Sequence, residues 1–500
     1  MQLPPQLIRH NLAKARKGTA PGPSGLTAEI AKVLLDDPIA AEAFQRVCLR
    51  LANATIPSTI AAAIGLGLGR MIALQKPSGG VRGLVVGDFL RCLVARSLAQ
   101  HYASDFDAKC HPFQYALSTR AGTEAFIHTL QLTTELDPSQ TILSVDGIGA
   151  YDHVSRASML QGLRHTPHAQ DALPFVRLFY SQPSTYLWVD DGGHVHRITQ
   201  ADGGEQGDPL MPALFSPGLD FALRAFQTEL VAGERVAAFL DDIYVTAQPN
   251  RIRALFDRLA HHLHSRTGIQ LHQGKTQVWN ASGILPPGIT SLTQSAAVWV
   301  GDHELPRRQQ GLRVLGLPIG TDEYIQEELA KLHAKQQPLL EAIPTAIPDL
   351  QTSWLLLLYC AAPRPRYALR GLRPDLTREF ATTHDQNIQH CLAQLLQLPA
   401  LPEQNAEKAR LALHHGGLGL RSALHHTAAA FWASWQDDPQ QDAGTFPTSG
   451  PPPAGTPATF ANFAMPHTCT NLPQQHRLRH ASMVRWNPTP STSPTARRTT

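Results

Sequence analysis

Two adjacent aspartates, Asp241 and Asp242, stand between two apolar runs of the chain. The runs on either side, 235–240 and 243–246, predict a β-hairpin with both carboxylates at its tip. Neighbouring acids beside apolar residues are costly unless water or a cation neutralises them. A plain turn also accommodates aspartate, but the Asn-Gly or Asp-Gly pair typical of tight hairpin turns is absent here. A solvated turn and a cation-binding pair are both consistent with this pattern.

A third acid, Asp146, follows the short β-branched run 141–145, which predicts a buried strand that ends at this residue. Gly147 comes next, and its lack of a Cβ would let backbone or a ligand approach closely. The alternative is that Asp146 caps the helix predicted to begin near His153, because aspartate is a frequent capping residue.

Taken together, the three acids suit the binding of hard divalent cations. A two-metal site needs several carboxylates around ions roughly 3.5–4 Å apart, one activating the attacking oxygen and one stabilising the leaving group. Mg²⁺ prefers oxygen ligands and keeps waters and substrate phosphates in its shell. Two separate strands of one sheet would supply these carboxylates, so the sequence predicts a magnesium site where such strands end.

The segment 203–215 offers groups that suit a nucleotide or a template strand. Gln206 carries both a hydrogen-bond donor and an acceptor. Gly207 would let the backbone lie against a ligand, and Pro209 can begin a helix. A plain turn before a helix explains the same residues, so this segment supports a binding site only in combination with the acids.

Two later segments carry weaker signals. In 268–276, Lys275 near a triphosphate could donate a proton to the leaving pyrophosphate, although a lone lysine is usually a solvated charge. The segment 314–320 predicts a strand and a turn, and it carries no chemistry by itself.

Strands and helices are predicted in irregular alternation around these segments. A second hairpin is predicted from 186–189 and 194–198, joined by an Asp-Asp-Gly-Gly turn. Apolar residues recur at helical spacing in the ranges 27–51, 86–106, 153–164, 209–229, 250–265 and 323–435. The absence of a regular βαβ repeat predicts an α+β fold.

Composition indicates a folded chain. Its 500 residues are 43% apolar and 17% charged, and the formal net charge of +3 permits nucleic-acid binding without requiring it. The six cysteines form no CxxC pair, so we expect neither a zinc finger nor a disulfide framework. This cysteine usage fits a reducing intracellular compartment. We expect no signal peptide, because the first residues lack an apolar core, and no apolar run approaches the roughly 20 residues of a membrane span.

The order of these segments resembles the reverse transcriptases of LINE-type non-LTR retrotransposons. That family shows, in sequence, a Gly-Pro turn, a Lys-Pro to Arg segment, the aspartate strand, a Gln-Gly segment, an aromatic-x-Asp-Asp hairpin, Lys-Thr and Leu-Gly. The counterparts here are 22–25, 76–82, 146–152, 206–215, 239–242, 275–276 and 315–316, and 113–122 resembles the stretch between fingers and palm. The match covers roughly residues 18–320, and the shared order is more specific than any single motif.

The resemblance implies a role for each matched residue. Asp146 and Asp241 would be catalytic metal ligands with Asp242 as the third, and two Mg²⁺ ions, or Mn²⁺, would be the cofactors. Lys275 matches the candidate general acid. The substrate-binding positions of the family correspond to Lys76, Arg82, Gly147, Tyr151, Gln206 and Gly207. Among them, Lys76 and Arg82 would meet the phosphates of the nucleotide and Tyr151 would contact its sugar. The primer-grip positions correspond to Leu315 and Gly316.

The implied architecture is a right-hand polymerase with fingers, a palm of antiparallel sheet and helices, and a helical thumb. The expected divisions are a basic N-terminal arm at 1–20, fingers at 21–135, palm at 136–322, helical thumb or connection at 323–437 and a disordered Pro/Ser/Thr-rich tail at 438–500. The chain departs from the family pattern at Ser24, Asp208 and Met211 and in the stretch 81–84, which leaves pocket details and phosphate contacts open. None of these departures removes a metal ligand.

The implied activity is RNA-directed DNA polymerisation, in which a primer 3′-hydroxyl attacks a dNTP. RNA template, DNA or RNA primer and dNTPs would be the partners, and no membrane is involved. The alternatives are a catalytically silent retroelement remnant that only binds RNA, and an RNA-dependent RNA polymerase, which tends to carry a small or polar group where Tyr151 stands. We expect the chain to be a polymerase module without its own nuclease. We also expect it to be intracellular, and to enter the nucleus if the element reaches chromosomal DNA.

Overall fold

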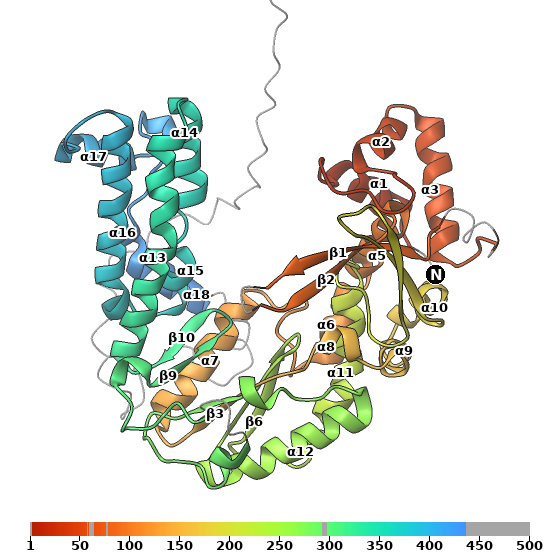
Figure 1. Cartoon of the computed structure of the whole chain (residues 1–500), viewed down its shortest axis with the longest axis horizontal. Helices are drawn as coiled ribbons and strands as arrows, with labels where there is room; N and C mark the ends of the chain where they lie inside the picture. The colour runs from red at the N-terminus through yellow and green to blue at the C-terminus, as the bar shows by residue number, and fades with distance from the viewer. Residues whose placement is uncertain (1–2, 58, 60–64, 77–78, 293–297, 437–500) are drawn as a thin grey trace, which may run out of the picture. The chain divides into compact units, whose positions relative to one another are not determined.

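A computed structural model describes residues 3–57, 59, 65–76, 79–292 and 298–436 (Figure 1). The tail predicted at 438–500 lies outside the described residues. Two four-stranded sheets and a two-stranded hairpin are set among helices without a repeated βαβ unit, so the predicted α+β class is confirmed. In the described part, no helix is both long and apolar enough to cross a membrane.

Three helices from the N-terminal region accompany helix α5. Their bounds are α1 (Pro5–Lys14), α2 (Ala28–Lys32), α3 (Pro38–Ala52) and α5 (Phe89–His101). Helix α1 falls within the segment expected as a basic arm and buries Ile8 and Leu12. The single helix predicted over 27–51 is broken, because Pro38 begins a new helix that Asp37 caps by accepting from the Ile39 N–H.

The first sheet has the order β2-β1-β4-β5, with bounds β1 (Leu68–Gln75), β2 (Val81–Val86), β4 (Ser184–Val189) and β5 (Val195–Gln200). Strand β1 pairs antiparallel with β2 but parallel with β4. Gly69 is opposite Tyr186 in this parallel pair, and a Cβ at Gly69 would lie 2.4 Å from Val85 Cγ1. A glycine is therefore required where β1 crosses the packed side chains of its neighbours.

The second sheet has the order β6-β7-β3-β8 and is antiparallel throughout, as the palm prediction required. Its bounds are β3 (Thr141–Asp146), β6 (Arg235–Phe239), β7 (Asp242–Ala247) and β8 (Gln277–Trp279). Successive residues of its inner strands face opposite cores, as the two-residue period of a strand requires. Leu143 and Val145 belong to one apolar cluster, whereas Ile142 and Tyr244 belong to another.

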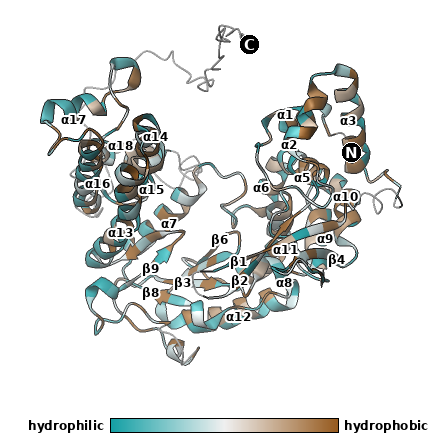
Figure 2. Cartoon of the chain, turned by 45° about the horizontal axis from the view of Figure 1, so that its top comes forward, coloured by the Kyte–Doolittle hydropathy of each residue, from teal (hydrophilic) through white to brown (hydrophobic). Residues whose placement is uncertain are grey.

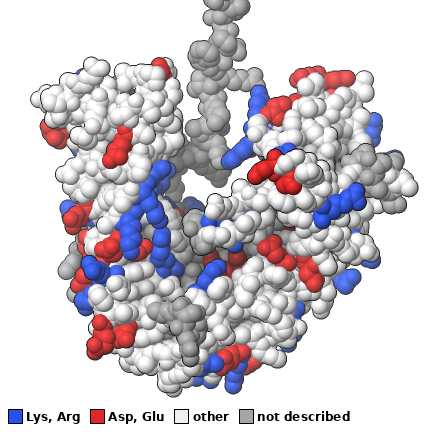
Figure 3. Space-filling model, in the orientation of Figure 1, with Lys and Arg blue, Asp and Glu red and all other residues white. Residues whose placement is uncertain are grey.

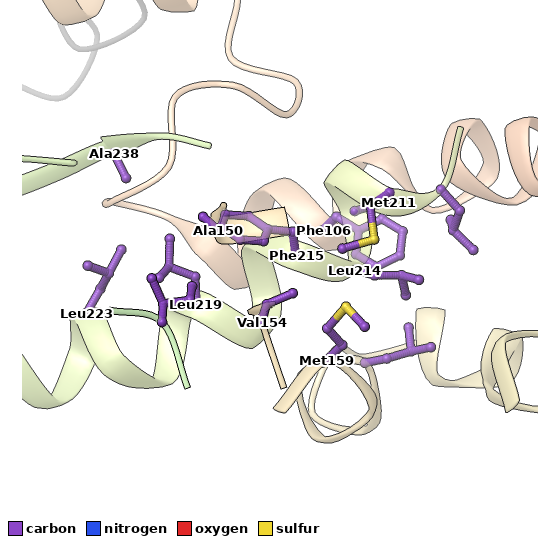
Figure 4. Packing of buried hydrophobic residues seen from close by; sticks show 14 of the residues in the cluster. Phe106, Ala150, Val154, Met159, Met211, Leu214, Phe215, Leu219, Leu223 and Ala238 are labelled. Carbon is purple, nitrogen blue, oxygen red and sulfur yellow. The ribbon is translucent and has the colours of Figure 1, made fainter. Parts of the chain in front are cut away.

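Helices cover one face of this sheet and build the larger core. The helices of this core are α6 (Ala103–Cys110), α8 (Ala150–His153), α9 (Arg156–Arg164), α10 (Leu173–Tyr180), α11 (Met211–Gln227) and α12 (Pro249–Thr267). Of these, α11 contacts β6 and α12 contacts β3. Helix α11 packs against both α9 and α12. Figure 4 shows Leu214, Phe215 and Leu219 of α11 near Met159 of α9 and Val154, which lies between α8 and α9.

The opposite face of the sheet contacts α7 (Gly122–Leu136) and the hairpin of β9 (Gly311–Val314) and β10 (Leu317–Gly320). Beyond this hairpin the chain is helical, with bounds α13 (Asp322–Ala346), α14 (Leu350–Leu356), α15 (Arg366–Gly371), α16 (Pro374–Leu395), α17 (Glu403–Arg410) and α18 (Ala423–Gln436). Helices α13 and α18 both pack on α16. Apolar and polar residues mix along these helices (Figure 2), as expected for helices that each bury one face.

Candidate active site

The register of the second sheet brings the predicted acids together. Strands β3 and β7 pair so that Asp146 is directly opposite Asp242. Side chains opposite each other in an antiparallel pair have Cβ atoms roughly 4.5–5.5 Å apart. Asp241 occupies the two-residue turn just before Asp242, so the three aspartates lie at the same end of the sheet.

These carboxylates carry more negative charge than their surroundings neutralise. Loss of solvation, followed by repulsion from Asp241 and Asp146, raises the pKa of Asp242 to about 6, although its exposed surface lets solvent screen part of this effect. Burial and the charge of Asp146 likewise raise the pKa of Asp241, while Arg82 and Lys275 act in the opposite direction. Such a site is expected to attract cations.

Lys275 supplies one positive charge. Its Nζ lies 2.5 Å from Asp146 Oδ2, and its side chain remains 59% exposed. The loop that carries it is attached to the end of β3, because the His272 N–H donates to the Asp146 carbonyl at 2.8 Å and Gly147 bridges to Leu271. In this arrangement no three His, Cys, Asp or Glu side chains of the described ranges are grouped closely enough to hold a metal ion.

The predicted sugar-contacting residue, Tyr151, lies beside the acids. Its ring stacks on Phe215 of α11 with centroids 4.6 Å apart and planes 6° apart. Burial, with the nearby charge of Asp241, raises the pKa of the Tyr151 phenol. Phe215 ends the segment 206–215 that resembles the family motif, but no role was predicted for it. Phe215 is buried, and its stacking shows that it supports the Tyr151 ring.

Gln206 and Gly207 form a loop against strand β2. The Gln206 carbonyl accepts from the Val85 N–H at 2.9 Å, and Gln206 Nε2 donates to both Asp152 carboxylate oxygens at 3.3 and 3.2 Å. Gly207 has φ +134°, and a Cβ there would lie 2.2 Å from the Val85 carbonyl oxygen. Only glycine fits this close approach, so a side chain at position 207 would push the loop away from β2.

Asp152 connects this loop to the predicted phosphate-binding cations. Burial raises the pKa of Asp152, while Gln206, His153, Lys76 and Arg82 oppose the shift. The positive charges of Lys76 and Arg82, on opposite sides of the β1–β2 turn, therefore act on the same carboxylate. Asp152 was part of the matched aspartate segment but had no predicted role.

A buried charge network holds the loop on both sides. Arg91 of α5 contacts Glu205 Oε1 at 3.0 Å and Asp208 Oδ2 at 3.2 Å, and all three side chains are nearly inaccessible to solvent. The Tyr180 hydroxyl donates to the same Asp208 oxygen at 2.7 Å. No local pattern in the sequence indicates Arg91, because its partners are more than a hundred residues away.

The predicted primer-grip residues form the turn of the β9–β10 hairpin. Leu315 and Gly316 both have positive φ, +47° and +92°. The Tyr367 hydroxyl donates to the Leu315 carbonyl at 2.8 Å, which attaches this turn to α15.

Comparisons with known proteins agree with this geometry. Residues 74–319 match the family described as "Reverse transcriptase (RNA-dependent DNA polymerase)". The retrovirus-related Pol polyprotein from the type-2 retrotransposable element R2DM of Drosophila melanogaster is 29% identical over 184 residues, which are 35% of this chain and 17% of that protein. The corresponding polyprotein from the type-1 retrotransposable element R2 of Popillia japonica is 26% identical over 244 residues, 46% of this chain and 33% of the relative.

Solved structures with some likeness include apo telomerase from Candida tropicalis, at 10% identity and a TM-score of 0.44, covering 74% of this chain and 62% of that one. A telomerase from Candida albicans in complex with a fragment of telomeric RNA has 11% identity and a TM-score of 0.37, covering 77% and 67%. The chain spans at most a third of the curated relatives it matches. The family match, with the antiparallel sheet that carries the acids, confirms the predicted right-hand polymerase class. This chain therefore contains, at residues 74–319, a segment that matches the reverse transcriptase family and is similar to the polyproteins of R2 retrotransposable elements.

Proposed function

We propose that this chain is an RNA-directed DNA polymerase that adds dNTPs to the 3′-hydroxyl of a primer paired with an RNA template. One observation carries the proposal: the β3–β7 register sets Asp146 opposite Asp242, with Asp241 beside them in the turn. The raised pKa of Asp242 fits a site that binds cations, because a bound cation would stabilise its ionised carboxylate.

The donor set suits Mg²⁺, or Mn²⁺, since every candidate ligand is an oxygen atom. Asp146, Asp241 and Asp242 would hold two ions, with the Gly147 carbonyl completing one shell. When bound, the two ions would favour ionisation of the primer hydroxyl and stabilise the charge on the leaving pyrophosphate.

The remaining residues orient the nucleotide and supply a proton. Tyr151, held flat against Phe215, would contact the sugar and disfavour a 2′-hydroxyl. The loop at Gln206 would receive the nucleotide, and Lys76 and Arg82 would attract its phosphates. Lys275 is exposed and carries a proton within reach of the acids, so it is the candidate donor to pyrophosphate.

The primer–template duplex would lie along the β9–β10 turn, at Leu315 and Gly316, and along the helices that follow. Figure 3 shows Lys and Arg side chains gathered over the region of α13 and α15. Some of the basic side chains there pair with acids, as Lys331 does with Glu328 and Arg370 with Glu124. Arg364, Arg366 and Arg370 contribute basic groups to this part of the chain. Contacts with phosphates would make duplex binding weaken as salt concentration rises.

A primer-extension assay tests the proposal. The purified chain is expected to extend oligo(dT) on poly(rA) with dTTP and Mg²⁺, and Asp146→Ala is expected to abolish extension while leaving filter binding of RNA intact. RNA binding without extension by the unaltered chain would identify a silent remnant. Preference for UTP over dTTP would identify an RNA-dependent RNA polymerase instead.

A further inference from the structure

The turn that carries Asp241 contains a residue in an unfavourable backbone conformation. Leu240 has φ +57°, in the left-handed region that favours glycine, asparagine and aspartate. Two-residue hairpin turns commonly use this region, but they usually place Asn or Gly there. A leucine at this point requires interactions from elsewhere in the molecule to keep the turn in one conformation.

Gln114 provides those interactions through both ends of its amide. Its Oε1 accepts from the Leu240 N–H at 2.7 Å, and its Nε2 donates to the Leu240 carbonyl at 3.5 Å. Glutamine suits this role because one side chain carries a donor and an acceptor. The side chain is buried, with the residue only 5% exposed, so water competes little for these bonds.

The backbone around Gln114 is itself fixed to the sheet. The Ala238 N–H donates to the Phe113 carbonyl at 2.7 Å, and the Tyr115 N–H donates to the Ala238 carbonyl at 3.0 Å. This short segment therefore runs beside β6 as an additional parallel neighbour. Ala238 is only two residues from Leu240, so Gln114 reaches the turn from a firmly attached position.

Side-chain packing fixes the same segment on both sides of Gln114. The Arg224 guanidinium lies over the Phe113 ring, 5.4 Å from its centre, and donates to the His111 carbonyl at 2.9 Å. The Tyr115 ring packs edge-on against Phe126. The amide of Gln114 therefore starts from a rigid support rather than from a free loop.

We infer that Gln114 is a positioning residue for the reaction, holding Leu240 so that Asp241 and Asp242 face Asp146 in one arrangement. This inference rests on the proposed polymerase function and adds to it a residue that touches neither substrate nor metal. A displacement of about 1 Å at a reacting centre can cost on the order of 100-fold in rate, so loss of this support has a measurable effect.

The test replaces the amide by an apolar side chain of similar length, Gln114→Met. We expect kcat for primer extension to fall about tenfold or more, with the KM for dTTP changed by less than about twofold. The Mg²⁺ concentration for half-maximal rate is expected to rise about threefold or more, because the carboxylates no longer hold one geometry. Thermal unfolding and RNA binding serve to show that the variant is folded.

A second substitution separates positioning from general damage. Leu240→Gly removes the steric reason for the support, since glycine adopts positive φ freely. In that background Gln114→Met is expected to cost less than about threefold, which a double-mutant cycle measures directly. Gln310→Met is the matched control, because Gln310 is also a buried glutamine, 4% exposed, that donates to the Leu305 carbonyl away from the turn.

Failure of the inference is distinguishable from failure of the proposed function. An unaltered chain that does not extend the primer contradicts the proposed function. If the unaltered chain extends and Gln114→Met works within about twofold of it, or if the loss is equal in the Leu240→Gly background, the inference about Gln114 is wrong. If Gln114→Met does not fold, Gln114→Asn carries the same expectation, because its amide is one methylene too short to reach both groups.

Discussion

The hairpins β4–β5 and β6–β7 each carry two adjacent aspartates at the turn, and their surroundings give these acids opposite properties. In β4–β5, Asp190 accepts from the N–H groups of Gly192 and His194 at 3.0 and 2.9 Å, and His196 Nε2 lies 2.8 Å from its other oxygen. The hydrogen bond with His196, followed by the backbone donors, lowers the pKa of Asp190. Both carboxylate oxygens of Asp190 therefore have hydrogen-bond partners within its own hairpin.

In β6–β7 the acids meet a third carboxylate from another strand. Asp146 is opposite Asp242, and burial with mutual repulsion raises the pKa values of Asp241 and Asp242. The contrast teaches that two aspartates in a hairpin turn do not by themselves indicate catalysis. Convergence of carboxylates from separate strands, with partial loss of solvent, is the distinguishing feature.

The largest effect is expected from removing one acid of each hairpin. Asp241→Ala is expected to reduce primer extension at least about 1,000-fold, because loss of a metal ligand removes several kcal/mol of transition-state stabilisation. Asp190→Ala, at an exposed turn, is expected to stay within about twofold. Single-turnover extension on one template measures both, and similar losses in the two variants would erase the contrast.

The two acid pairs are also expected to differ in metal binding. Mg²⁺ at ten times its Kd would stabilise the unaltered chain by about 1.4 kcal/mol, seen as a rise in Tm that EDTA reverses. Asp241→Asn is expected to lose this rise, whereas Asp190→Asn keeps it. A Tm that responds to Mg²⁺ equally in both variants would place the cation elsewhere.

The pH dependence of stability is expected to have opposite signs in the two hairpins. The pKa of Asp242 is about 6, above its ordinary 3.8, so the folded chain holds the proton more tightly and loses stability as pH rises between those values. In EDTA, Asp242→Asn is therefore expected to stabilise the fold above pH 6 by about 1 kcal/mol after solvent screening, with the gain vanishing near pH 4.

Asp190 shows the reverse dependence. The pKa of Asp190 is lowered, so its charge stabilises the fold above its ordinary value of 3.8, and this contribution is lost as pH falls through the lowered value. Asp190→Asn is expected to destabilise the fold slightly at neutral pH. Urea unfolding across this pH range compares the two variants, and curves of the same sign would contradict the assigned environments.

The smallest effect concerns the backbone of the turns. Gly193 in the β4–β5 turn has φ +80°, and nothing lies within 4 Å of an added Cβ. Gly193→Ala is expected to lower stability by roughly 1 kcal/mol from backbone strain alone, with no change in extension rate. A Tm shift measures the first effect, and a slower polymerase would show that this hairpin takes part in the reaction.

Strands whose pattern depends only on neighbouring residues were predicted close to their observed bounds. The strand predicted at 141–145 is β3, and the hairpin predicted at 186–189 and 194–198 is β4–β5, displaced by two residues at most. Strands β1 and β2 were not predicted, because Arg and Gly interrupt their apolar pattern. The parallel pairing of β1 with β4 depends on residues more than a hundred positions apart, which no local pattern reports.

The residues of the candidate site also divide into those predictable from local patterns and those that depend on distant contacts. Asp146, Asp241 and Asp242 were predicted as a set because their order along the chain matched a known pattern, and the register then placed two of them opposite each other. Gln114 fell in a matched stretch, but its amide contacts Leu240, 126 positions later, so its role was not predictable. Contacts of this kind become visible only when the segments are folded together.

The Arg91 network has a consequence for how this chain can change over generations. Loss of Arg91 alone leaves Glu205 and Asp208 as buried carboxylates without their cation, and breaking a buried pair in this way typically destabilises a protein by about 3–5 kcal/mol. Replacing the whole set with apolar residues of similar volume is often neutral or stabilising. Arg91 is therefore tied in inheritance to its two acids, and a randomised library selected for folding should seldom return a replacement of Arg91 with both acids kept.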